Sequence, residues 1–312
     1  MGWEKINMPK YVAEVKRNMN IDISDEIIAK DLLLTLVLAE FENEGGIFKE
    51  LIFKGGTLLS RNFLKYHRFS EDLDFVHKDS GRLRELTRNK RERKIKEFID
   101  IFVPQLKKVS DNLKLDFAAD RSNTKYCTVL SGRAVYIFRL HYGGNNYIKV
   151  EINFVEKLLH KPKEVPIKAI TDFFDSKELL FILGLDAKNL RILSYPIEEI
   201  ALEKYRALLT RPSLMERDLF DLFLMPNSLK IDCKECAEKI KASSLIKKEL
   251  EKLISNNLKN LNNNSFFKSE ENIADMAIIK YDLKAFENFK NKIKPLLIKI
   301  CELFLEKEGI KR

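Results

Sequence analysis

Residues 53–75 read FKGGTLLSRNFLKYHRFSEDLDF, and this stretch decides how the chain is interpreted. Gly55, Gly56 and Thr57 follow a short apolar run and precede a segment whose apolar residues have helical spacing. A tight glycine turn at a helix N-terminus presents backbone N–H groups and the positive end of the helix dipole to an anion. The segment therefore predicts a turn that binds phosphate.

The end of the same stretch, SEDLDF, alternates polar and apolar residues as a half-buried strand does. Side chains two residues apart share one face of a strand, so Asp72 and Asp74 point the same way while Leu73 and Phe75 enter a core. Two neighbouring carboxylates repel each other unless a cation lies between them. The pattern predicts a metal platform beside the phosphate turn.

A third carboxylate is available in residues 147–154, YIKVEINF, which alternate in the same way. Glu151 shares the polar face of this expected strand with Lys149 and Asn153. The pattern alone leaves two interpretations open: Glu151 is a third metal ligand, or it is an exposed carboxylate paired with Lys149.

Together these segments resemble the nucleotidyltransferase superfamily of the DNA polymerase β type, whose pattern is Gly-Gly/Ser, a helix, then Asp-x-Asp. More narrowly, GGTxL followed by RFSEDLDF resembles the AbiEii toxin branch, which includes the MenT toxins, the toxin halves of toxin–antitoxin pairs. Thr57 stands where the wider superfamily has serine and keeps the hydroxyl. The resemblance implies the following nucleotide-binding residues: Gly55, Gly56, Thr57, Arg68 and Ser70.

The resemblance also favours Glu151 as the third acid, because that branch has one in a Lys-x-Glu-Ile type strand. Asp72, Asp74 and Glu151 would then be both metal ligands and catalytic residues. An all-oxygen ligand set suits Mg²⁺, with two ions expected and Mn²⁺ as a possible substitute. The implied reaction transfers nucleoside monophosphate from an NTP and releases pyrophosphate.

A second motif lies downstream in residues 198–224, EEIALEKYRALLTRPSLMERDLFDLFL, which reads as two helices. It resembles the branch's Lys-x-x-Ala-x-x-x-Arg and Arg-Asp-x-x-Asp-Leu pattern, whose lysine and aspartate contact the nucleotide or the active site. This implies catalytic roles for Lys204 and for Asp218 or Asp221, and nucleotide binding by Lys204. We therefore expect Lys204→Ala to lose activity and keep its stability. Charge spacing alone also permits a helix pair joined by ion pairs, with Arg217 and Asp221 four residues apart.

The predicted fold is α+β: a polymerase β-like nucleotidyltransferase domain with a mixed sheet, followed by an all-helical half. The expected domains are residues 1–185 and 186–312. The expected helices before and after the first motif are residues 9–19, 25–44 and 81–108. The expected strands are residues 115–119, 125–130, 134–142, 147–154 and, more weakly, 190–193. A loop is expected at Pro162 and Pro166, and an exposed loop at the asparagine-rich residues 256–265.

Charge favours an anionic partner, because the 312-residue chain has a formal net charge of +9 and a pI near 9.1. Residues 82–96 contain eight Lys or Arg against two Glu, which suits an RNA backbone, although a solvated helix face explains such a run as well. No apolar stretch approaches the roughly 20 residues of a membrane helix and no signal-peptide core is visible, so we expect a cytoplasmic protein without membrane contact.

The resemblance and the charge together predict an RNA acceptor, with the 3′ end of a tRNA as the leading candidate. The expected partner is a cognate antitoxin, with a winged-helix regulator as its usual type. Two alternatives stand beside this interpretation. A transferase for a small hydroxylated molecule, such as an aminoglycoside, would need an acidic pocket that this basic chain does not indicate. A non-catalytic nucleotide-binding regulator should have lost a carboxylate, and none is lost.

Overall fold

The computed structural model describes residues 4, 6–173, 191–243, 247–269, 271, 273 and 276–307. The chain forms two compact units, Met1–Val155 with Pro162–Tyr195, and Glu156–Lys161 with Pro196–Arg312. The predicted domain boundary at residue 185 lies outside the described residues. In the part of the chain that is described, no helix is long and apolar enough to cross a membrane.

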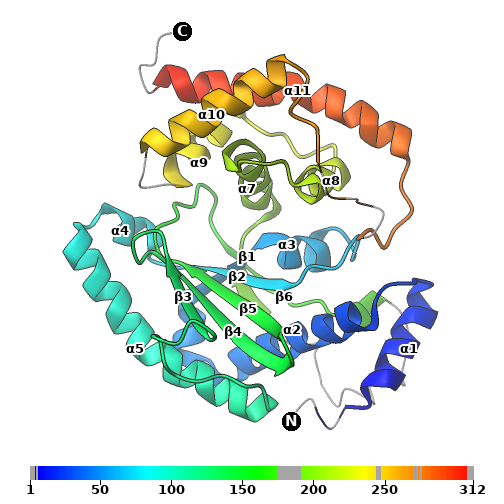
Figure 1. The fold of residues 1–312 in the computed structure, drawn as a ribbon, viewed down its shortest axis with the longest axis vertical. Helices are drawn as coiled ribbons and strands as arrows, with labels where there is room; N and C mark the ends of the chain where they lie inside the picture. Colours follow the sequence, from blue (N-terminus) through cyan, green and yellow to red (C-terminus); the bar gives the residue numbers. More distant parts are fainter. Residues whose placement is uncertain are drawn as a thin grey trace. The chain divides into compact units, whose positions relative to one another are not determined.

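A seven-stranded mixed sheet with the order β3-β4-β5-β2-β1-β7-β6 organises the first unit (Figure 1). The two central neighbours β2 and β5 are parallel, as are β1 and β7, and the remaining pairs are antiparallel. The strands are β1 (Leu51–Lys54), β2 (Asp72–His77), β3 (Cys127–Leu130), β4 (Val135–Gly143), β5 (Asn146–Asn153), β6 (Lys163–Pro166) and β7 (Arg191–Ser194).

The helices of this unit are α1 (Met8–Met19), α2 (Asp25–Glu44), α3 (Gly55–Leu58), α4 (Ser80–Glu85) and α5 (Arg88–Leu113). Aromatic contacts hold α2 and α5 against one face of the sheet. The ring centroid of Phe98 on α5 lies 5.4 Å from that of Phe154, and the ring centroid of Phe102 lies 5.3 Å from that of Phe138. On α2, Phe41 lies 5.9 Å from Phe75 of β2. Burial of these apolar side chains is the main stabilising contribution to the unit.

The alternation read from the sequence is confirmed in the two central strands. Leu73 and Phe75 of β2 are fully buried, as are the inward residues of β5, whereas Asp72 and Asp74 lie on the half-buried opposite face. Because one face of the sheet is covered by α2 and α5, the acidic residues are left on the other.

The second unit is helical in its described part, with α7 (Ile197–Thr210), α8 (Glu216–Leu224), α9 (Cys233–Ser243), α10 (Lys247–Asn262) and α11 (Leu283–Lys307). The long α11 packs against each of the other four helices. The short segment Glu156–Lys161 joins this unit through a buried ion-pair cluster. In it, Lys239 lies 2.9 Å from Glu156 and 2.6 Å from Glu199.

Four expectations about local structure were wrong. The expected helix 81–108 is two helices, α4 and α5, because Leu86 is extended and Thr87 begins a new helix as its N-cap. Residues 115–119 contribute only one isolated bridge, between Asp116 and His141. Pro162 and Pro166, which were expected in a loop, lie at the two ends of β6: Pro162 precedes the strand and Pro166 is its last residue. This strand is at the edge of the sheet, where a missing N–H is tolerated. The asparagine-rich stretch is helical through Asn262, because α10 packs on α11.

Candidate active site

The glycine turn at the end of β1 brings together the residues that the sequence predicted there. Gly55 has a φ of +84°, and a Cβ on it would collide with the carboxylate of Asp74. A Cβ on Gly56 would lie 2.9 Å from both Arg68 Nη2 and Ser70 Oγ. Both positions require glycine for these close approaches, so the turn, the guanidinium and Asp74 form one compact group.

The helix after the turn is shorter than expected. It spans Gly55–Leu58 and continues as a π-helical turn over Leu59–Phe63. Thr57 is buried, and its hydroxyl donates a 2.5 Å hydrogen bond to the backbone carbonyl of Asp72. Thr57 therefore fastens the turn to β2. A short helix supplies a smaller dipole than a long one, so the helix dipole by itself would attract an anion only weakly.

The three predicted carboxylates lie on neighbouring strands. In the parallel pair β2–β5, Asp74 is the register partner of Glu151, and Asp72 is the partner of Lys149. Asp74 and Glu151 are each 26% exposed and Asp72 is 41% exposed, so all three are accessible from solvent. Parallel pairing has therefore gathered acids that are separated by 77 residues in sequence onto one patch.

Two lysines of this patch were not predicted as site residues. The Nζ of Lys149 lies 2.9 Å from Asp72 Oδ2, 3.4 Å from Glu151 Oε2 and 4.0 Å from Asp74 Oδ1. Lys54 is the register partner of Asp74 across β1 and β2, is buried, and lies 6.0 Å from the ring centroid of Tyr195. Lys149 shares a strand face with Glu151, a signal already visible in the sequence; the position of Lys54 depends on strand pairing.

Burial and the neighbouring Glu151 carboxylate raise the pKa of Asp74 to about 6, with Asp72 adding to the effect and Lys149 and Lys54 opposing it. Although burial acts in the other direction, the carboxylates of Asp74, Asp72 and Glu151 raise the pKa of Lys149. The patch thus has an excess of negative charge that its lysines only partly neutralise.

This excess charge predicts a stability change on replacing Asp74 in the metal-free protein. The folded state holds the Asp74 proton more tightly than the unfolded state, so the free energy of unfolding falls as pH rises from about 4 to above about 6. Asp74→Asn should be more stable than the parent at pH 8, by on the order of 1–3 kcal/mol, and no more stable at pH 4.

Denaturant unfolding in the presence of a chelator, repeated across this pH range, measures the difference. Glu71→Gln is the matched control, because Glu71 is the neighbouring exposed acid outside the patch and pairs with Lys30. An Asp74→Asn protein that is less stable than the parent at pH 8 would contradict the electrostatic description of the patch.

The donor set of the patch fits a hard divalent cation. Three carboxylates supply oxygen ligands of the kind that Mg²⁺ and Mn²⁺ prefer, and the glycine turn packs directly against one of them, Asp74. Among the residues that the structure describes, no three acid, His or Cys side chains already stand in metal-binding geometry. The Lys149 ammonium lies among the carboxylates instead.

The residues of the second motif meet in the second unit. Lys204 on α7 lies 2.7 Å from Asp218 and 2.6 Å from Asp221, both on α8, and all three side chains are buried. Arg211 also pairs with Asp218. Although burial acts in the other direction, Lys204 and Arg211 hold the pKa of Asp218 below its ordinary value. The spacing also permitted a pair between Arg217 and Asp221.

Arg217 contacts Glu271 instead, at 3.7 Å between side chains and at 3.2 Å from its backbone nitrogen. Asp221 faces inward toward α7 and is fully buried, so Lys204 reaches it and Arg217 does not. The helix pair is thus joined by ion pairs, as the alternative interpretation of the motif required. Its nucleotide-binding role stays a prediction.

The basic run of residues 82–96 covers α4 and the first turns of α5. Arg88, Lys90, Arg93, Lys94 and Lys96 are exposed. The first turn of α5 contains no acidic residue, so positive side chains there oppose the positive end of the helix dipole. An anion bound at this surface would relieve that repulsion.

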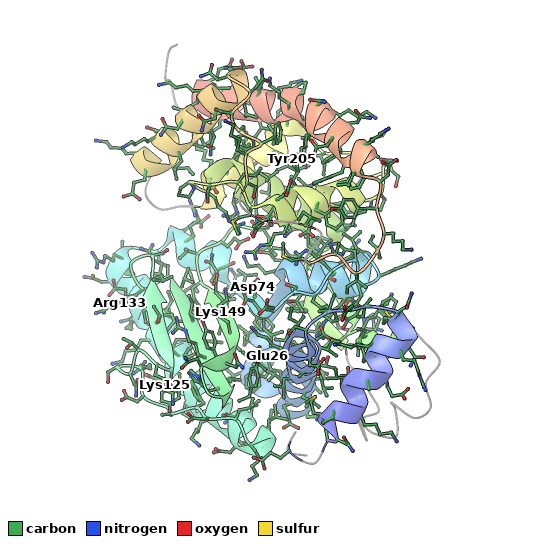
Figure 2. All side chains as sticks on the ribbon, turned by 45° about the vertical axis from the view of Figure 1, so that its right-hand side comes forward. Glu26, Asp74, Lys125, Arg133, Lys149 and Tyr205 are labelled. Carbon is green, nitrogen blue, oxygen red and sulfur yellow. The ribbon has the colours of Figure 1, made fainter. Side chains whose placement is uncertain are left out.

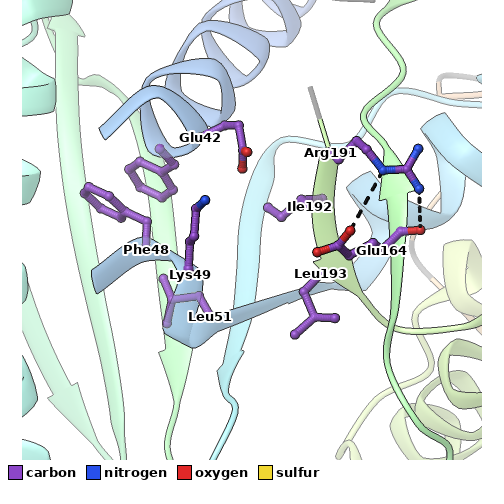
Figure 3. Close-up of a pocket in the computed structure, with 9 residues that line it drawn as sticks. Glu42, Phe48, Lys49, Leu51, Glu164, Arg191, Ile192 and Leu193 are labelled. Carbon is purple, nitrogen blue, oxygen red and sulfur yellow. Dashed lines mark hydrogen bonds and ion pairs between the residues drawn. The ribbon is translucent and has the colours of Figure 1, made fainter. Parts of the chain in front are cut away.

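A cavity of about 290 Å³ in the first unit contains none of the predicted site residues (Figure 3). Leu51 at the start of β1 lines it, whereas the glycine turn follows the other end of that strand. Arg191 and Glu164 pair across its rim at 3.9 Å. The cavity is therefore separate from the carboxylate patch.

The fold and the patch define an enzyme of the nucleotidyltransferase class: a glycine turn beside paired acids on a mixed sheet. A family model described as "Nucleotidyl transferase AbiEii toxin, Type IV TA system" matches residues 37–301. The chain belongs to this family of nucleotidyltransferase toxins, which confirms the predicted resemblance and implies an antitoxin partner.

Among solved structures, the chain is similar to MenT4, a nucleotidyltransferase toxin from Mycobacterium tuberculosis H37Rv. The two share 14% sequence identity with a TM-score of 0.48, over 96% of this chain and 99% of the other. None of the curated proteins matches the chain.

Proposed function

We propose that this toxin transfers nucleoside monophosphate from an NTP to an RNA hydroxyl, with a tRNA 3′ end as the leading acceptor. The observation that carries the proposal is the register of β2 and β5, which aligns Asp74 with Glu151 and leaves Asp72 on the same face. Asp74 also lies directly against Gly55, where a triphosphate would bind.

In the proposed reaction, the acceptor hydroxyl oxygen attacks the α-phosphorus. The bond from that phosphorus to the bridging oxygen of the β-phosphate breaks, pyrophosphate leaves, and the hydroxyl proton passes to solvent. The phosphates would bind at the Gly55-Gly56 turn, where Arg68 and Ser70 pack against Gly56 and would donate hydrogen bonds to them.

Asp72, Asp74 and Glu151 would hold two Mg²⁺ ions, for which Mn²⁺ can substitute. Bound there, these ions supply charge neutralisation at the phosphate oxygens and activation of the attacking hydroxyl. We further propose that Lys204, Asp218 and Asp221 act on the nucleotide. The antitoxin would be a winged-helix regulator, and both proteins would act in the cytoplasm.

Incubation with each labelled NTP, Mg²⁺ and total tRNA, followed by a denaturing gel, tests the function directly. We expect a labelled band at tRNA length with one NTP preferred, and loss of labelling with a chelator. Label that appears only in a small acceptor, such as an aminoglycoside, would contradict the RNA assignment and leave the transferase class intact.

The acceptor assignment predicts an effect of charge on α5. Replacing Lys90 and Lys96 by Glu should weaken tRNA binding and reduce the slope of log affinity against log salt by about 0.7–0.9 for each phosphate that the protein no longer neutralises. NTP affinity should not change. Both lysines are exposed, so the substitutions should leave the fold intact.

Lys107→Glu is the matched control, because Lys107 is half-buried on the same helix and pairs with Asp111 near the C-terminal end of that helix. Binding measured by filter retention at several salt concentrations separates the variants. An equal loss of NTP binding would assign the basic run to the nucleotide site; an unchanged salt slope would show a solvated helix face.

A further inference from the structure

The ammonium of Lys149 lies where a cation is needed among three carboxylates. It is within 2.9 Å of Asp72, 3.4 Å of Glu151 and 4.0 Å of Asp74, and its side chain is 25% exposed (Figure 2 labels Lys149 and Asp74). Two of these acids, Asp72 and Glu151, flank the lysine directly: one is its register partner on β2 and the other is two residues away on β5.

An ammonium and a divalent cation cannot both use the same oxygens. A cation bound by these carboxylates would share the oxygens that Nζ contacts, so two like charges would repel strongly in a partly desolvated site. The lysine has a flexible four-carbon stem, so it can move if another negative group receives it. The glycine turn at Gly55 packs against Asp74, and a triphosphate bound at that turn would supply such a group.

We propose that Lys149 is the internal counter-ion of the carboxylate patch. It holds the acids together when no metal is present, and it is displaced toward the triphosphate when metal and NTP enter. This inference rests on the proposed function. In this role Lys149 makes metal binding weak in the absence of nucleotide. Binding of the metal and binding of the NTP are then coupled, because each supplies the counter-charge that the other needs.

The charges of the patch support this coupling. The ammonium groups of Lys149 and Lys54 face three carboxylates, so the patch keeps an excess of negative charge. Two divalent ions added to the same group would over-neutralise it. The negative charges of a triphosphate remove that excess, so the loaded site is balanced only when both ligands are present.

Titration of the full-length, nucleotide-free protein with Mn²⁺, with free Mn²⁺ followed by electron paramagnetic resonance, tests the proposal without measuring activity. Lys149→Met keeps the aliphatic stem and removes the charge, and Lys149→Gln is a second variant that keeps a hydrogen-bond donor. The matched control is Lys125→Met, an exposed lysine that pairs with Asp116 at 2.7 Å outside the patch.

We expect both Lys149 variants to bind Mn²⁺ at least about tenfold more tightly than the parent without nucleotide, while Lys125→Met is unchanged. Their melting temperatures should be lower than the parent's with a chelator and should rise more on adding Mn²⁺. A non-hydrolysable α,β-methylene NTP analogue, tested for each base, should tighten Mn²⁺ binding in the parent more than in the variants.

Unchanged or weaker Mn²⁺ binding in both Lys149 variants would overturn the counter-ion role. Asp74→Asn separates this failure from that of the proposed function. If Asp74→Asn abolishes Mn²⁺ binding while the Lys149 variants match the parent, only the role of Lys149 is wrong. If the parent binds no Mn²⁺ even with every analogue, the metal-dependent function itself is wrong.

Discussion

Asp74→Asn is expected to abolish nucleotide transfer, with a loss of more than about 1000-fold, or about 4 kcal/mol of transition-state stabilisation. Asp74 lies at the meeting point of the site: its register partner is Glu151, and its carboxylate is packed against Gly55. Asparagine keeps the shape and removes the charge. Asp72→Ala and Glu151→Ala should cause losses of the same kind.

The fold should survive these changes, because removing an acid from the patch relieves repulsion in the metal-free protein. The labelled-NTP gel measures activity, and circular dichroism confirms folding. Glu71→Gln is the control, an acid beside the motif whose side chain is 56% exposed and pairs with Lys30. Near-normal labelling by a folded Asp74→Asn protein would show that the carboxylate patch does not hold the catalytic metal.

Lys204→Ala is expected to lower the free energy of unfolding by about 3–5 kcal/mol, because it leaves two buried carboxylates without their shared cation. Asp218 is 4% exposed and Asp221 is fully buried, so solvent cannot replace the lysine. The sequence predicted a loss of activity without a loss of stability. The buried pairing predicts a loss of stability as well.

Denaturant unfolding of Lys204→Ala measures the stability change. Lys157→Ala is the matched control in the same unit, since Lys157 forms a half-exposed pair with Glu238 at 2.9 Å and should cost under about 1 kcal/mol. A loss of under about 1 kcal/mol for Lys204→Ala would show that the helix pair does not depend on this lysine.

The proposed contact of Lys204 with the nucleotide needs a separate measurement. At a low temperature where the variant is folded, transfer should still be about ten- to a hundredfold slower, the value of a charge-assisted phosphate contact. A folded Lys204→Ala protein that transfers at the parent's rate would limit this lysine to holding α7 and α8 together.

Local patterns predicted much of the fold correctly, because strand alternation and helix spacing follow from backbone geometry. The faces of β2 and β5 and the bounds of α2 agree with the sequence. The proximity of Arg68 and Ser70 to Gly56 also follows from a short connection. Some local predictions were wrong, such as the loop expected where the structure has the edge strand β6. That strand depends on pairing with β7, which is distant in sequence.

The contacts of the site residues also divide into those that local spacing predicts and those that depend on tertiary packing. Lys54 joins the patch only through the pairing of β1 with β2, and Lys149 meets Asp72 only through the pairing of β2 with β5; no periodicity within one strand reveals either contact. Arg217 contacts Glu271, which is 54 residues away, so spacing within a helix did not identify its partner. The packing of whole helices and strands decides which distant residues come into contact, and the spacing of residues within one helix does not predict such contacts.

By itself, the sequence predicted which residues carry the chemistry: a glycine pair and alternating acids from their spacing, and a downstream lysine from the resemblance to the toxin branch. The tertiary structure alone decided which charges neutralise one another. It placed the Lys149 ammonium among three acids and buried Lys204 between Asp218 and Asp221. Electrostatic energy depends on distance and burial, and both are set only when separate strands and helices pack together.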